Sequence, residues 1–210
     1  MENTQEQALL LEALSDKVLH QLPPGVWKGL FLGAERDSIR FEQRHLTLVH
    51  ADAEVPPAQT GSITEHFYQE LQRLNARHGG RLDPYVNATA LVTFEDPASA
   101  VRMAIELQRA AEDVPLRIGV VSGLCTLAFF RAQGRLWCTP LGAEPARAAQ
   151  VAASAAAGAI VISPEAYEPS ELSVRLRTDQ RPAADFRDSE VDLSSLAADT
   201  AIDGVDILLA

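Results

Sequence analysis

Residues 81–94 read RLDPYVNATALVTF, and this stretch decides the fold that we expect. The pattern indicates two short strands that meet at a turn over Asn87 and Ala88. Tight hairpins usually have glycine in such a turn, because both central residues need positive φ. Here the turn has no glycine, and Pro84, which follows Asp83, cannot donate a backbone hydrogen bond. The sequence therefore predicts a hairpin whose tip carries no carboxylate.

Strand and helix patterns alternate on both sides of this hairpin. Residues 45–51 alternate as a strand does, and residues 62–80 have the apolar spacing of a helix. A second helix follows Asp96, which is suited to be its N-cap, and residues 115–122 again indicate a strand. The order β-α-β-β-α-β over residues 45–122 predicts an α+β fold with a ferredoxin-like core, an antiparallel sheet with helices packed on it.

Residues 5–22 are predicted to form a helix with a narrow apolar seam. Such a seam suits either a two-stranded coiled coil with a second chain or a helix packed on its own domain, and the sequence leaves both open. The seam consists of Leu11, Leu14, Val18 and Leu22. We accordingly divide the chain into an N-terminal helical segment that could dimerise or transduce a signal (1–40), a main domain (41–170), and a C-terminal extension with an acidic loop and possible strands (171–210).

A second hairpin is predicted over residues 124–138, with its turn at Gln133 and Gly134, and it contains both cysteines of the chain. Cys125 and Cys138 could lie opposite each other as a redox pair, or they could be ordinary buried thiols. The five histidines are scattered and form no zinc-binding pattern.

The composition of the 210-residue chain restricts its partners. The formal net charge is −11 and the sequence pI is about 4.9. An acidic surface repels nucleic acid and anionic membranes, so we expect neither as a partner. No apolar run approaches the ~20 residues of a spanning helix, and the N-terminus lacks the basic-then-apolar order of a signal peptide. We therefore expect a cytoplasmic protein with reduced cysteines.

An ordered series of stretches resembles the catalytic domain of class III adenylate/guanylate cyclases. The resemblance covers about residues 20–170 and implies the same fold. The stretches are LPPGVWKGLFLG (22–33), RHLTLVHADAE (44–54), LNARHGGRLDPYVNATALVTFEDP (74–97), AVRMAIELQRA (100–110), LRIGVVSGLCTL (116–127) and GAIVISPEAYE (158–168).

The resemblance implies a site of six side chains that lies across a dimer interface. In the family, two Asp bind two metal ions, and a Lys with an Asp or Thr reads the purine. An Asn positions the ribose, and an Arg stabilises charge that develops at the α-phosphate. In that order, the matching positions of this chain hold Asp52 and Ala88, Pro84 and Thr139, Ala146, and Gln150.

Only Asp52 and Thr139 keep a suitable side chain, as a vestigial metal ligand and a vestigial purine contact. Asp52 could equally be a solvated carboxylate, and Thr139 an ordinary strand-end residue. We therefore expect a catalytically inactive cyclase-like domain, a pseudoenzyme without a cofactor. It would act as a regulatory or scaffolding module in intracellular signalling, as a homodimer and with an unidentified signalling protein. The alternative is a residual or active adenylate cyclase that makes cyclic AMP from ATP.

Overall fold

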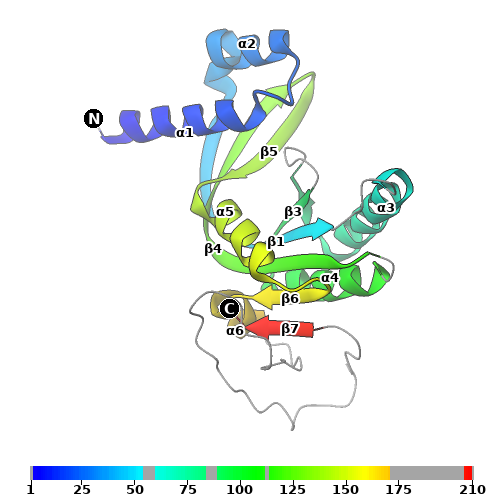
Figure 1. The fold of residues 1–210 in the computed structure, drawn as a ribbon. Coiled ribbons are helices and arrows are strands. Elements are labelled where there is room, and N and C mark those ends of the chain that lie inside the picture. Colours follow the sequence, from blue (N-terminus) through cyan, green and yellow to red (C-terminus); the bar gives the residue numbers. More distant parts are fainter. Residues whose placement is uncertain (1, 54–59, 84–88, 112–113, 171–205, 210) are drawn as a thin grey trace.

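The computed structural model describes residues 2–53, 60–83, 89–111, 114–170 and 206–209. Within them the chain forms a mixed sheet with helices on both faces (Figure 1). The elements are α1 (Glu2–Val18), α2 (Pro24–Leu32), the 3-10 helix η1 (Ala34–Ser38), β1 (Arg40–Ala53), α3 (Thr60–His78), β2 (Arg81–Leu82), β3 (Thr89–Phe94), α4 (Pro97–Ala110), β4 (Leu116–Ala132), β5 (Arg135–Leu141), α5 (Ala143–Ser154), β6 (Ala159–Ile162), α6 (Pro164–Ser170) and β7 (Asp206–Leu209).

The predicted β-α-β-β-α-β core is confirmed as β1-α3-β2-β3-α4-β4. Its strands lie in the order β2-β3-β1-β4, and every neighbouring pair is antiparallel. The sheet then continues through β6 and β7, which are parallel to β4 and to each other, so the complete sheet is mixed. The predicted hairpin turn over Asn87 and Ala88 lies outside the described residues.

Strands β1 and β4 are much longer than the sequence patterns predict. Residues 115–122 and the first arm of the predicted second hairpin are a single strand, which pairs with β1 from Arg40↔Phe129 to Ala53↔Leu116. Gly123 suggests a strand break in the sequence, but it lies inside β4. A glycine is needed there because the carboxylate of Glu144 fills the space that a Cβ would occupy. Both strands bend along their length (Figure 1).

Local signals in the sequence account for the ends of two elements. Asp96 caps α4 as predicted, since its carboxylate accepts hydrogen bonds from the backbone N–H groups of Ala98 and Ser99. Gln133 and Gly134 form the predicted turn between β4 and β5, and both have the positive φ that a two-residue hairpin turn requires.

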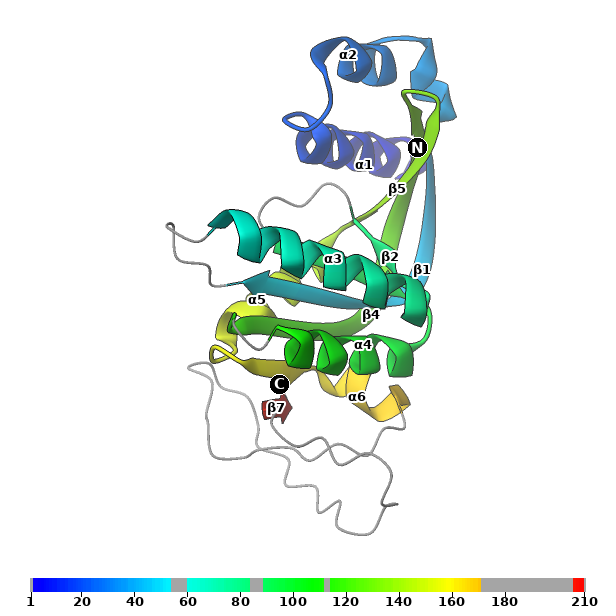
Figure 2. The same cartoon turned by 90° about the vertical axis from the view of Figure 1, so that its right-hand side faces the viewer.

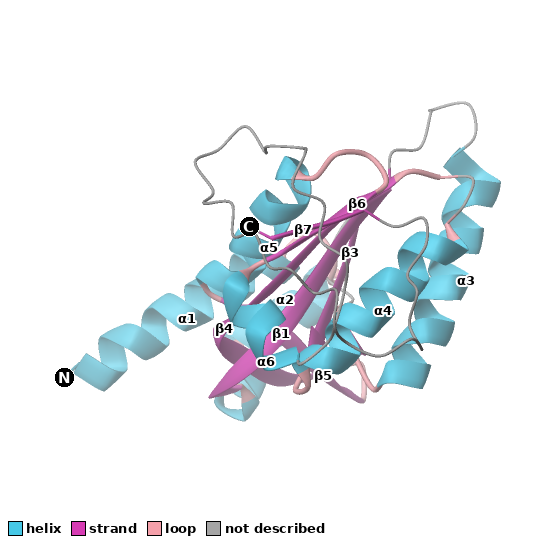
Figure 3. Ribbon diagram, turned by 90° about the horizontal axis from the view of Figure 1, so that it is seen from below, coloured by secondary structure: helices cyan, strands magenta, loops and turns pink. Residues whose placement is uncertain are grey.

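Two hydrophobic clusters cover the two faces of the sheet. Helices α3 and α4 lie on one face and α5 on the other (Figures 2 and 3). The first cluster includes Leu71, Leu74, Met103, Leu107, Ile118 and Val120, and the second includes Leu48, Val121, Leu127, Ala148 and Val151. Along β4 the side chains alternate between these clusters, as expected for a strand buried on both faces.

A third cluster joins α1 and α2 to the outer halves of β1, β4 and β5. Leu14 and Val18 of the α1 seam are fully buried beside Phe130 and Leu141. In this structure the seam therefore packs on its own chain, which was one of the two alternatives. Among the described residues, no helix is long and apolar enough to cross a membrane.

The two cysteines are not cross-strand neighbours, so the redox-pair alternative is wrong for this structure. Cys138 lies opposite Phe129, because β5 turns back immediately after Ala132, while Cys125 lies opposite Arg44 of β1. Both thiols are free. Burial raises the pKa of Cys125 to about 11, and the negative charge of Glu144 adds to this effect.

Replacing Gly119 by alanine tests the close contact between β4 and α5. A Cβ at this position would overlap the backbone nitrogen of Ala152 and the backbone oxygen of Ala148. We expect Gly119→Ala to lower the free energy of unfolding by about 1–3 kcal/mol, as for other overpacked sites, measured by urea denaturation. Gly25→Ala on α2 is the matched control, because its Cβ would meet nothing within 4 Å. Equal stability of both variants would contradict the contact.

Candidate functional site

Asp52 lies near the end of β1, beside the point where β3 begins. It is paired with Thr89 of β3 on one side and with Arg117 of β4 on the other. Ala88, the second metal position of the resemblance, lies outside the described residues, as does Pro84. No group of three or more His, Cys, Asp or Glu side chains that could hold a metal is found in the described part of the chain.

Asp52 shares a face of the sheet with α5. Val49 and Ala51 face α3 and α4, so strand alternation places His50 and Asp52 on the opposite face, which α5 covers. Ala146 and Gln150 lie one turn apart on α5, and both are exposed. The structure therefore brings the metal, ribose and transition-state positions of the resemblance to the same face of the sheet.

His50, like Arg117 of β4, is a titratable neighbour of Asp52 on this face. The imidazole is 9 % exposed. Burial lowers the pKa of His50 below its usual value, and the negative charge of Asp52 offsets part of that effect. The lowered pKa favours the neutral form of the His50 imidazole.

Thr139 belongs to a separate, buried polar cluster. Its hydroxyl donates a hydrogen bond to one carboxylate oxygen of Asp83 at 2.9 Å. The other oxygen of Asp83 accepts from the ammonium of Lys17 at 2.6 Å, and this ammonium also donates to the backbone oxygen of Pro140 at 2.9 Å. We call Lys17, Asp83, Thr139 and Pro140 the lysine cluster.

The lysine cluster joins three distant parts of the chain. It ties the end of α1 to the residue after β2 and to β5, although β2 and β5 are separated in the sheet by β3, β1 and β4. A second contact links the same strands, because Arg81 donates to the Cys138 sulfur at 3.2 Å. The bend of β1 and β4 allows β5 to reach β2.

Sequence reasoning missed Lys17 and Asp83. The Asp83 side chain is 0 % exposed and that of Lys17 is 19 % exposed, so both charges are largely removed from water and must be paired. One signal was available, since Lys17 sits within the apolar seam, directly beside Val18, where a charged side chain needs a partner. The identity of that partner, 66 residues away, could not be found from spacing.

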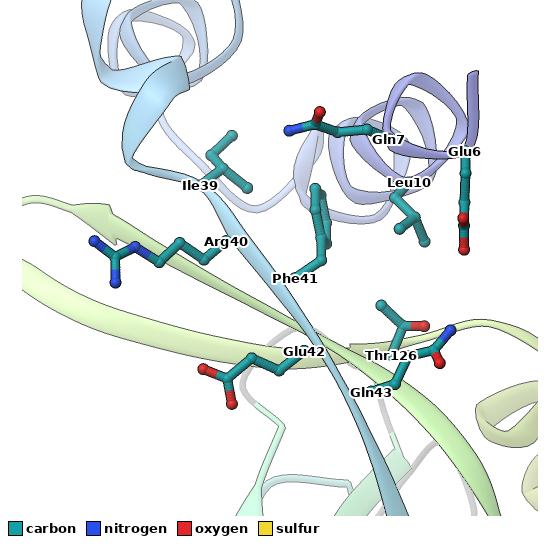
Figure 4. Close-up of a pocket in the computed structure, with 9 residues that line it drawn as sticks. All are labelled: Glu6, Gln7, Leu10, Ile39, Arg40, Phe41, Glu42, Gln43 and Thr126. Atoms are coloured by element: carbon teal, nitrogen blue, oxygen red, sulfur yellow. The ribbon is translucent and has the colours of Figure 1, made fainter. Parts of the chain in front are cut away.

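A groove of about 670 Å³ lies at the other end of β1. It runs between α1 and the first residues of β1, and Phe41 points toward Gln7 and Leu10 of α1 (Figure 4). Its lining includes Glu6, Arg40, Glu42 and Thr126 but none of the positions named by the resemblance. This groove is therefore distinct from the region around Asp52.

Comparisons with known proteins identify the fold. No family model matches the chain, and no curated protein matches it. Solved structures do match. The adenylyl cyclase CyaB from P. aeruginosa is 22% identical, with a TM-score of 0.54 over 61% of this chain and 81% of that one. The guanylyl cyclase Cya2 is 18% identical, with a TM-score of 0.58 over 68% and 88% of the two chains.

A third match is the dimeric guanylyl cyclase domain of the RhoGC fusion protein from the aquatic fungus Blastocladiella emersonii. It is 15% identical, with a TM-score of 0.54 over 61% of this chain and 84% of that one. At such identities the likeness establishes the fold alone. The chain therefore has the α+β fold of nucleotidyl cyclase catalytic domains.

Substitutions of Lys17 and Asp83 test the ion pair. Lys17→Met leaves a buried carboxylate without a cation, so we expect a loss of about 3–5 kcal/mol in the free energy of unfolding. Lys17→Met combined with Asp83→Leu should regain most of it, because both charges are then absent. Lys28→Met, at an exposed lysine of α2, should change stability by no more than about 0.5 kcal/mol. If urea denaturation shows that Lys17→Met lowers the free energy of unfolding no more than Lys28→Met does, the Lys17–Asp83 ion pair is not formed in solution.

Proposed function

We propose that this chain, which has a nucleotidyl cyclase fold, is catalytically inactive and acts as a regulatory or scaffolding module through protein contact. One observation carries the proposal. The two exposed α5 positions where the resemblance requires a ribose-binding Asn and a cationic Arg present the methyl group of Ala146 and the carboxamide of Gln150. Neither side chain can supply positive charge to a phosphate.

The nearest arginine on α5 does not replace the missing cation. Arg147 lies between the two positions in sequence, but its guanidinium donates to Glu165 at 2.8 Å and to Glu144 at 3.4 Å. Its charge is already balanced by two carboxylates of its own chain. An incoming triphosphate would have to compete with both of them.

Charge also argues against a bound nucleotide. ATP carries about four negative charges, and a binding site must neutralise them with metal ions and cationic side chains. This chain has a net charge of −11, and the positions for the neutralising groups hold Pro84, Ala88 and Gln150. Loss of a single stabiliser of transition-state charge costs about 10²–10³ in rate. Loss of the metal site together with the arginine should leave no measurable turnover.

Association through the surface that carries these positions follows from the same losses. The resemblance implies that each site lies across a dimer interface, whereas the RhoGC cyclase domain of similar fold forms a non-canonical dimer. Exchange of charged groups for Ala, Pro and Gln makes such a surface more apolar, which favours protein contact. We therefore propose a homodimer, with a further signalling protein as the partner that it regulates.

Cyclase assays test the proposed inactivity. We expect no conversion of ATP or GTP to a cyclic nucleotide with Mg²⁺ or Mn²⁺, because the charges at the family positions are missing. Turnover that is abolished by Asp52→Ala would instead establish the alternative, an active adenylate cyclase. A restored variant should regain Mn²⁺-dependent ATP binding in calorimetry through its metal and phosphate contacts, without a contact from Thr139 to the purine. It carries Pro84→Lys, Ala88→Asp, Ala146→Asn and Gln150→Arg.

A matched control for the restored variant keeps similar shapes without the charges. It carries Pro84→Gln, Ala88→Asn, Ala146→Asn and Gln150→Met, and it should bind no ATP. Equal binding by the two variants would show that the positions are wrongly matched. Tight ATP binding by the unmodified chain would refute the proposal.

Sedimentation tests the proposed homodimer. Because the interface positions have lost their charges, we expect the mass of a dimer at micromolar concentrations. Gln150→Glu on the exposed face of α5 should weaken the dimer, since it places like charges at the proposed interface. Gln133→Glu, in the exposed turn between β4 and β5, is the control for added charge. A monomer mass that does not change with concentration would remove the homodimer.

A further inference from the structure

We propose that α1 is a closing element, in which Lys17 occupies the Asp83–Thr139 pair from within the chain and blocks the access of purines to Thr139. The inference rests on the cyclase-like site that underlies the proposed function for one assignment only, that of Thr139 to base reading, which the resemblance implies. Its other observations are the contacts of the lysine cluster, which lie outside the face shared by Asp52 and α5.

The hydrogen-bonding groups at this position are already engaged. The Thr139 hydroxyl donates to Asp83, so its proton is not available to a ring nitrogen. Both carboxylate oxygens of Asp83 accept hydrogen bonds, one from Thr139 and one from Lys17. The ammonium of Lys17 also donates to the Pro140 carbonyl. A purine would therefore have to displace contacts that the chain makes with itself.

Displacement of the Lys17 ammonium from Asp83 is unfavourable because the Asp83 carboxylate is buried. Asp83 has no exposed side-chain surface. If a neutral purine replaced the ammonium, the carboxylate would stay buried without a cation, which is strongly destabilising. Closure therefore depends on charge as well as on the space that the lysine fills.

Apolar contacts hold the same end of α1 in place. Leu14 and Val18, on either side of Lys17 in the sequence, are fully buried in the third cluster. Leu9 is 61% exposed, and the N-terminal half of α1 extends away from the sheet (Figure 3). The helix is thus attached by its C-terminal half, with the lysine at the attachment point.

Lys17 does not act as a substitute purine reader in this arrangement. The chain lacks the lysine that the resemblance places at Pro84, and Lys17 lies beside Asp83, the neighbour of that position. A reader, however, would present its ammonium to an open pocket. Lys17 is only 19% exposed, and its ammonium already has two acceptors within the chain.

Amine labelling of the full chain tests the closure, because the sequence contains only two lysines. Lys28 on α2 is exposed and serves as the internal control. With limiting acetylating reagent and peptide mass spectrometry, we expect Lys17 to react at least about 100-fold more slowly than Lys28. Millimolar ATP or GTP with Mn²⁺ should leave this ratio unchanged.

Two results would overturn the inference. Equal reactivity of the two lysines would mean that α1 is not docked. A change in Lys17 reactivity on adding nucleotide would mean that a purine reaches the pair, by releasing the lysine if labelling accelerates or by covering it if labelling slows. Nucleotide binding seen by calorimetry with unchanged labelling would count against the proposed function but not against the closure.

An Asp83→Asn variant tests the cause of protection. Removal of the carboxylate charge should raise the labelling of Lys17 toward that of Lys28, with Lys28 itself unchanged. If circular dichroism shows that this variant is unfolded, Thr139→Val serves instead. It keeps the ion pair, removes one hydrogen bond to Asp83, and should raise Lys17 labelling severalfold. Unchanged labelling in a folded Asp83→Asn variant would show that the pair does not protect the lysine.

Discussion

The continuous antiparallel pairing of β1 with β4 is the interaction on which the rest of the structure depends. The register runs without interruption from Arg40↔Phe129 to Ala53↔Leu116. A slip of one residue would exchange the two faces of each strand, so the burial of both faces fixes the register. The inner half of this pair carries α3, α4 and α5, and Asp52 lies near its end. The outer half carries β5 and the N-terminal helices.

The bend of this strand pair gives the molecule two chemically different regions. Around Asp52 the sheet meets α5, whose exposed positions Ala146 and Gln150 are uncharged. Around Thr139 the bent strands bring β5 against the end of β2, and the polar groups there bond to one another. The first region has no cation at the two α5 positions of the resemblance, and the second has a cation, Lys17, that is already paired.

The sequence predicted the order of elements well because the local signals were strong. Asp96 marked the start of α4, and Gln133 with Gly134 marked a tight turn, and the structure confirms both. Strand lengths were harder to predict, because Gly123 looks like a break unless the approach of Glu144 is known. The parallel pairing of β7 with β6 was equally hard to predict, because residues 171–205 separate β7 from the rest of the sheet in the sequence.

The candidate site was predictable only in part, for a related reason. The resemblance assigned Asp52, Thr139, Ala146 and Gln150 one residue at a time, and the structure places three of them on one face. It could not assign Lys17, since no periodicity connects a helix residue to a carboxylate 66 positions later. Long-range ion pairs are set by the bend and twist of the whole sheet, which a local pattern does not contain.

The contact of Lys17 with Pro140 can form only late in synthesis of the chain. The two residues are 123 positions apart, so α1 leaves the ribosome long before its acceptor exists. At about 5–20 residues per second, this interval is roughly 6 to 25 s. During that time the side chains of Leu14 and Val18 have no β5 to cover them. A nascent chain with this topology therefore carries the apolar seam of α1 without its β5 cover until more than a hundred further residues have been added.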